Sequence, residues 1–108
     1  MPPKEFKYYL NENVFISVFL YTVRGKVNDF VVKLNCITNN TVAEIIPFDT
    51  AHGCIHKDVL RPDGTKEYVK KYHSIDLNAG VDFATADIEE HWEFYIERYN
   101  KWQSERKG

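Results

Sequence analysis

The segment VFISVFLYTV, residues 14–23, limits the possible folds of this chain more than any other stretch. Its β-branched and aromatic residues suit a pleated strand, and both sets of alternate residues are largely apolar. A strand with two apolar faces is typically covered on both sides, so we expect it to lie centrally in a sheet. It contains Ser17 and is far too short to cross a bilayer, so we expect no contact with a membrane.

Other strands are predicted from alternating patterns and from the turns between them. The asparagines of TNN, residues 38–40, tolerate positive φ and indicate a tight turn. In RPDGT, residues 61–65, Pro62 presets φ and Gly64 accepts the left-handed conformation, which indicates a hairpin. The predicted strands cover residues 14–23, 30–36, 42–48, 54–60 and 65–72, with a short further candidate at 6–10.

The last third of the chain predicts one helix from Val81 onward. Its apolar and aromatic residues recur at alternating spacings of four and three, which traces one stripe along a helix: Val81, Thr85, Ile88, Trp92, Tyr95, Tyr99 and Trp102. Asp76 or Asn78 can cap the N-terminus of this helix. Packing on the sheet explains the stripe better than a coiled-coil seam or a cofactor site. The aromatic end at Tyr99 and Trp102 could also serve a dimer contact.

These elements predict an α+β fold: an antiparallel meander sheet of about five strands packed on one C-terminal α-helix. The second face of the sheet should be partly open. A chain of 108 residues has the usual size of one domain, so we treat residues 1–108 as a single domain with frayed ends at 1–5 and 104–108.

The charge of the chain limits its possible partners. A formal net charge of −2 is unlike that of a dedicated nucleic-acid binder, so any phosphate contact must depend on a local patch. Residues 56–73 supply one, with five basic residues against three acidic ones, whereas residues 82–98 carry six acidic residues and one arginine. Two cysteines and no secretory signal favour the cytoplasm.

The segment DTAHGCIHKDVLRPDG, residues 49–64, concentrates titratable side chains next to the predicted hairpin turn. Residues two apart share one face of a strand, so His52, Cys54, His56 and Asp58 should project together. The His-x-x-x-His spacing suits zinc on a helix, but along a strand it spans about 13 Å, too far for one ion. Cys54 and His56 are a feasible ligand pair, yet a third ligand is not evident. We therefore predict no metal and no cofactor.

Acid–base chemistry is the second interpretation of this segment. His56 and Asp58 lie about 6.6 Å apart at Cα along a strand, close enough for the carboxylate to orient the imidazole. If residues 62–64 form a three-residue loop, the ladder brings Lys70 opposite His56; a two-residue loop would shift this register by one.

Such a set could cleave a phosphodiester bond. His56 would be the general acid or base, Asp58 its orienting partner, His52 a second proton carrier and Lys70 a clamp for phosphate. Asp49 either joins this set or caps the turn that follows it. The candidate catalytic residues are His56, Asp58, His52, Lys70 and Asp49.

The segment FDTAHGCIHKDVLRPDGTKE, residues 48–67, resembles a family of small uncharacterised prokaryotic proteins. The shared pattern is an aromatic residue with Asp-Thr-Ala-His-Gly, then His-x-Asp, then Pro-Asp-Gly and an aromatic-ended helix. It is matched here by residues 48–53, His56, Asp58 and residues 62–64, and the resemblance covers roughly the C-terminal two-thirds of the chain. A fainter resemblance is to TumE-like toxins of toxin–antitoxin pairs, in which the histidines are more densely clustered. That resemblance implies ribonuclease activity.

The leading hypothesis is a small RNA-cleaving or RNA-binding protein of toxin type, with an antitoxin-like protein as a partner. The alternative is a non-enzymatic protein-binding module or a homodimeric interaction protein, which uses the open sheet face or the aromatic helix end. An enzyme should gather His52, His56 and Asp58 in one concave pocket, whereas a binding module would leave them spread over a flat face.

Overall fold

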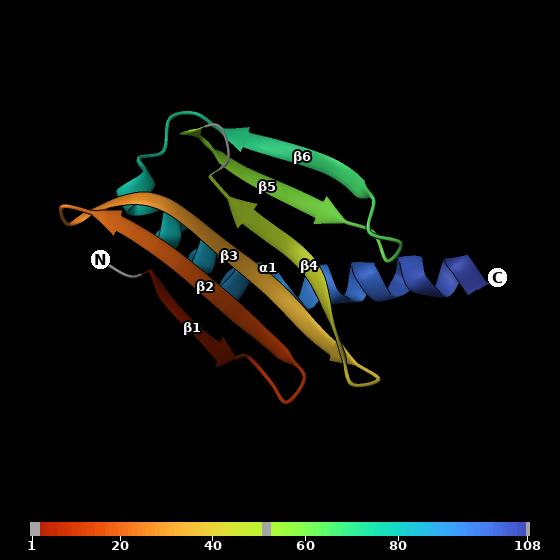
Figure 1. Ribbon diagram of the computed structural model, residues 1–108. Coiled ribbons are helices and arrows are strands. Elements are labelled where there is room, and N and C mark those ends of the chain that lie inside the picture. The colour runs from red at the N-terminus through yellow and green to blue at the C-terminus, as the bar shows by residue number, and fades with distance from the viewer. Residues whose placement is uncertain (1–2, 51–52, 108) are drawn as a thin grey trace.

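The computed structural model describes residues 3–50 and 53–107 as one antiparallel sheet with a long helix across one face (Figure 1). The strands lie in chain order across the sheet, which confirms the predicted α+β meander. The sheet has six strands instead of about five, because the candidate stretch before the central strand does form one. The elements are β1 (Lys4–Tyr9), β2 (Val14–Val23), β3 (Lys26–Thr38), β4 (Thr41–Asp49), β5 (Ile55–Leu60), β6 (Lys66–Tyr72) and α1 (Leu77–Lys107).

The core lies between the sheet and α1. The register of β2 and β3 places Ile16 opposite Leu34 and Val18 opposite Val32, so one apolar set of each strand faces the helix. Ile88 of α1 is fully buried against this layer. Helix and sheet approach each other closely at Gly80, where a Cβ would lie 2.6 Å from the ring of Phe30. A side chain at that position would push the helix away from the sheet.

The helix begins at Leu77, earlier than the predicted Val81, because Asp76 caps it. The backbone N–H of Asn78 donates to Asp76 Oδ1 at 2.7 Å, which satisfies one of the free donors of the first turn. The Asn78 side chain accepts a hydrogen bond from the Val27 N–H at 2.8 Å and ties the start of the helix to the β2–β3 turn. Within the described residues, no helix is long and apolar enough to cross a membrane.

The β5–β6 hairpin joins the rest of the sheet through a short ladder. Among the described residues, two pairs connect β4 and β5: Phe48 with Lys57, and Asp49 with His56. At the hairpin turn, the Arg61 N–H donates to the Thr65 carbonyl at 2.8 Å, as the three-residue loop predicts.

A register shift at Val59 and Leu60 then changes the pairing of the hairpin. Because of this irregularity, Lys70 pairs with Lys57 and Lys71 pairs with His56. The predicted pairing of Lys70 with His56 is therefore wrong by one residue. A one-residue change moves a side chain to the other face of the sheet, so Lys70 cannot stand beside His56.

Candidate functional site

Three titratable residues lie directly opposite one another across three neighbouring strands. Asp49 of β4 pairs with His56 of β5, and His56 pairs with Lys71 of β6. Directly opposite residues of antiparallel strands have their Cβ atoms about 4.5–5.5 Å apart. We refer to Asp49, His56 and Lys71 as the Asp–His–Lys row.

The row lies on the open face of the sheet, away from α1. Lys57, the neighbour of His56, pairs with Phe48, whose buried ring packs edge-on against Phe83 of the helix. Since successive residues of a strand point to opposite faces, His56 points away from the helix. Asp49 and His56 are half-buried and Lys71 is exposed, so a solute can reach the row from solvent.

The other predicted site residues are distributed differently. Asp58 shares the face of His56 but is only 7% exposed, and its carboxylate lies 3.4 Å from the ammonium of Lys66. Lys70 projects to the helix side of the sheet, with its Nζ 5.1 Å from the centre of the Tyr72 ring. His52 lies outside the described residues. The structure thus places Asp49 opposite His56 and keeps Asp58 on the same face. The lysine opposite His56 is Lys71 and not the predicted Lys70.

Cys54 also approaches His56 on this face. Its Sγ lies 3.4 Å from His56 Nε2. Cys54 and His56 were the feasible ligand pair for a metal. In the described part of the chain, no group of three or more His, Cys, Asp and Glu side chains is placed to hold an ion.

A buried polar cluster on the opposite face of β5 was missed by the sequence interpretation. Lys57 Nζ donates a hydrogen bond to the Tyr95 hydroxyl at 2.6 Å and lies 3.2 Å from Asp87 Oδ2. The Tyr95 hydroxyl in turn donates to Asp87 Oδ2 at 2.6 Å. Lys57 and Tyr95 are each only 6% exposed. We refer to these three residues as the Lys–Asp–Tyr cluster.

The cluster lies on the helix side of β5 and contributes no side chain to the Asp–His–Lys row on the open face. Burial, followed by the hydrogen bond to Asp87, raises the pKa of Tyr95 far above its ordinary value, so the phenol stays neutral. The Lys57 ammonium also lies 4.7 Å from the Tyr95 ring centre. These contacts hold β5 against α1 on the face of the sheet opposite the His56 side chain. The sequence does contain a signal for the burial of Lys57. Ile55, Lys57 and Val59 are alternate residues of one strand, so they share a face, and that face is otherwise apolar.

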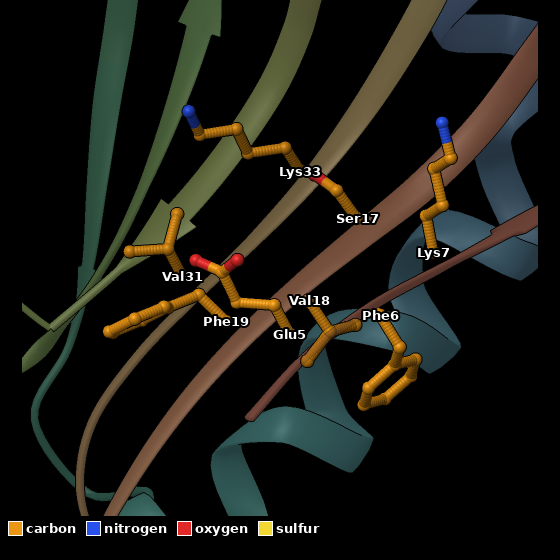
Figure 2. A pocket seen from close by; sticks show the side chains of 8 residues that line it. All are labelled: Glu5, Phe6, Lys7, Ser17, Val18, Phe19, Val31 and Lys33. Atoms are coloured by element: carbon orange, nitrogen blue, oxygen red, sulfur yellow. The ribbon is translucent and has the colours of Figure 1, made fainter. Parts of the chain in front are cut away.

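Neither of two hollows in the described structure is lined by a member of the Asp–His–Lys row. One, of about 550 Å³, lies on the open face over β1, β2 and β3. Figure 2 shows the ammonium groups of Lys7 and Lys33 projecting from β1 and β3, with Ser17 of β2 between them. Neither this hollow nor the second one is lined by His56 or Asp58, so neither is the concave pocket expected of an enzyme from the sequence. Val31, which lines the first hollow, pairs directly with Asp49, so this hollow borders the row at the β3–β4 side.

The second hollow, of about 680 Å³, runs along the C-terminal part of α1. The Arg98 guanidinium lies 5.0 Å from the ring centre of Phe94 and 5.1 Å from that of Trp102. Its Nε is buried and, within the described chain, has no hydrogen-bond partner. Phe94 is 57% exposed. We refer to Phe94, Arg98 and Trp102 as the helix-end patch.

Comparison with known proteins gives one match. The family model described as "Domain of unknown function (DUF7718)" matches residues 1–105. This range includes every strand of the sheet, the Asp–His–Lys row and nearly all of α1. No curated protein and no solved structure matches the chain.

Proposed function

Because this chain belongs to the DUF7718 family, whose description names no activity, we propose from its own residues that it cleaves RNA in a toxin-type role. The observation that carries this proposal is the pairing of Asp49 with His56 and of His56 with Lys71. A carboxylate, an imidazole and an ammonium in one accessible row are the groups that proton transfer next to a phosphate requires.

Each member of the row has a distinct role in the proposed reaction. The His56 imidazole, as general base, removes the proton of a ribose 2′-hydroxyl, whose oxygen attacks the adjacent phosphorus while the bond to the 5′-oxygen breaks. The Asp49 carboxylate orients the imidazole, and Lys71 stabilises the negative charge that develops on the phosphate oxygens. His52, the predicted second proton carrier, would return a proton to the departing 5′-oxygen.

The distribution of charge supports the approach of RNA from the open face. The hairpin carries Lys66 and Lys71, while the acidic residues of α1 lie on the other side of the sheet. Glu89, Glu90, Glu93 and Glu97 are all exposed there, where they would repel a polyanion. A net negative protein can therefore still present one face on which phosphate is not repelled.

Adjacent lysines of β6 provide a matched test of this proposal. Lys71→Met should lower the rate of RNA cleavage by about 10²-fold, because it removes the charge that stabilises the transition state. Lys70→Met removes the same charge from the opposite face and should leave the rate near that of the wild type. The measurement is the cleavage rate of a fluorescently labelled RNA, with thermal unfolding recorded for each variant. A loss of cleavage with Lys70→Met alone would place the active face on the wrong side of the sheet.

A second function, protein binding, is favoured by the helix-end patch. Tryptophan, arginine and exposed phenylalanine are the residue types that concentrate binding energy in protein interfaces. The Arg98 guanidinium lies against the rings of Phe94 and Trp102 and supplies the positive charge of the patch. We propose that the patch binds a partner segment in which a carboxylate stands beside a large apolar side chain. An antitoxin-like protein is a fitting source of such a segment.

Selection from a random peptide library tests the proposed binding function. The wild-type protein should enrich peptides with an acidic residue next to an apolar one. Phe94→Ser should abolish the apolar preference, and Arg98→Gln should abolish the acidic one, because each removes the group that recognises that position. Val42→Ser is the matched control, since Val42 is equally exposed but lies on β4. Identical enrichment by all four proteins would exclude the helix-end patch as the binding site.

A further inference from the structure

The outer edge of β1 is a regular strand edge that no other strand of the described chain covers (Figure 1). The pairing of β1 with β2 runs from Lys4 to Tyr9 without a register shift. Phe6 and Tyr9 are large apolar residues of this strand and are 53% and 50% exposed. An unpaired, regular and partly apolar edge presents backbone donors and acceptors to which another strand can add.

We propose that β1 pairs antiparallel with β1 of a second copy, with Phe6 opposite Phe6 of the second copy. The two sheets would then form one continuous sheet, with both helices on the same face. This inference goes beyond the proposed reaction, because β1 lies at the edge of the sheet opposite the Asp–His–Lys row.

Symmetry restricts the possible registers of such a pair to a few. Two identical antiparallel strands are related by a twofold axis perpendicular to the sheet, so residue i faces residue j and residue j faces residue i. Directly opposite residues share a face of the sheet, so their numbers differ by an even number. A single residue of β1 must therefore stand opposite itself at the axis.

Charge selects Phe6 among the central residues of β1. With Lys7 at the axis, two lysines would face each other, and with Glu5 at the axis, two glutamates would do so. With Phe6 at the axis, Glu5 faces Lys7 of the second copy on both sides of the centre. Opposite charges placed directly across a strand pair stabilise it, whereas like charges destabilise it. Figure 2 shows Glu5 and Lys7 projecting from β1 on the face away from Phe6.

The other edge of the sheet, β6, is less suited to self-pairing. A register irregularity interrupts its ladder with β5, and such bulges blunt strand edges. β6 carries three lysines against Glu67, and Glu67 already pairs with Arg61 at 2.6 Å. In contrast, neither Glu5 nor Lys7 forms an ion pair within the described part of the protein. The self-complementary charges of β1 therefore remain available to a second copy.

Charge reversal on β1 tests the dimer. The association state of wild type, Glu5→Lys and Lys7→Glu should be measured by sedimentation equilibrium over a concentration series. We expect the wild type to dimerise and each single variant to associate at least about tenfold more weakly, because each change turns two attractive pairs into repulsive ones. The double variant Glu5→Lys/Lys7→Glu should dimerise like the wild type, and an equimolar mixture of the two single variants should form a heterodimer.

Lys4→Glu is the matched control, because it makes the same charge change on the same strand but faces Tyr8 of the second copy. It should dimerise, and circular dichroism should show that every variant is folded. A wild type that stays monomeric at all concentrations would overturn the proposal. So would a dimer that both single charge reversals leave intact, because its interface would lie elsewhere. Measuring RNA cleavage by a monomeric variant distinguishes a failure of the proposed dimer from a failure of the proposed reaction.

Discussion

His56→Ala is expected to lower RNA cleavage by about 10²- to 10⁴-fold while leaving the protein folded. The imidazole is the group of the Asp–His–Lys row that serves as the general base in the proposed reaction. Alanine cannot replace this function, and neither Asp49 nor Lys71 can assume it. The measurement is the rate of RNA cleavage by the purified variant, together with growth of a host that expresses either the wild type or the variant.

The fold should survive this change because His56 is half-buried and faces away from the core. Thermal unfolding of His56→Ala should therefore stay close to that of the wild type. Cys54→Ala is a useful control, since the Cys54 Sγ lies 3.4 Å from His56 Nε2 but has no part in the proposed proton transfer. Undiminished cleavage by His56→Ala would contradict the proposed reaction, and loss of cleavage with Cys54→Ala would indicate a thiol mechanism instead.

Asp87→Ala is expected to lower the free energy of unfolding by about 3 kcal/mol, since it leaves the Lys57 ammonium buried without its anion. This expected loss of unfolding free energy lies at the lower end of the range for broken buried ion pairs, because the Asp87 side chain is itself 19% exposed. The Tyr95 hydroxyl loses its acceptor in the same variant. Urea denaturation measures the change.

Two further variants separate the ion pair from other effects of Asp87→Ala. The double variant Lys57→Met/Asp87→Leu should recover most of the loss, because apolar side chains of similar size can replace a buried pair without an uncompensated charge. Glu44→Ala breaks the more exposed pair with Lys33 and should cost less than about 1 kcal/mol. Equal losses in Asp87→Ala and Glu44→Ala would show that burial does not strengthen the Lys–Asp–Tyr cluster.

The strands, the helix and the hairpin turn could be predicted because each is determined by residues close together in sequence. The β-branched and aromatic residues of 14–23 define that strand, and the aromatic stripe defines α1. β1 was only a candidate because its residues are nearly all exposed, so no apolar alternation marks it. The cap at Asp76 was among the two proposed, and it moves the helix start to Leu77.

The candidate site could be predicted only in part, because its geometry depends on pairings between distant residues. His56 and Asp49 were identified from their segment, but their direct pairing depends on how β4 meets β5. One irregular position near Leu60 places Lys71 instead of Lys70 opposite His56, and no local sequence signal marks this irregularity. The burial of Lys57 depends on Asp87 and Tyr95, which come from a helix much later in the chain.

The short ladder between β4 and β5 sets the thermodynamic stability of the proposed site. Asp49 belongs to the larger block of strands, while His56 and Lys71 belong to the hairpin. Among the described residues, two ladder pairs join β4 to β5, and the contacts of Lys57 with Asp87 and Tyr95 hold the hairpin on α1. Detachment of the hairpin would separate the carboxylate from the imidazole, and it would also expose Ile55 and Val59, which are buried in the core. In the proposed reaction, RNA cleavage would therefore require a docked hairpin, and a local opening would abolish it while β2 and β3 stay paired.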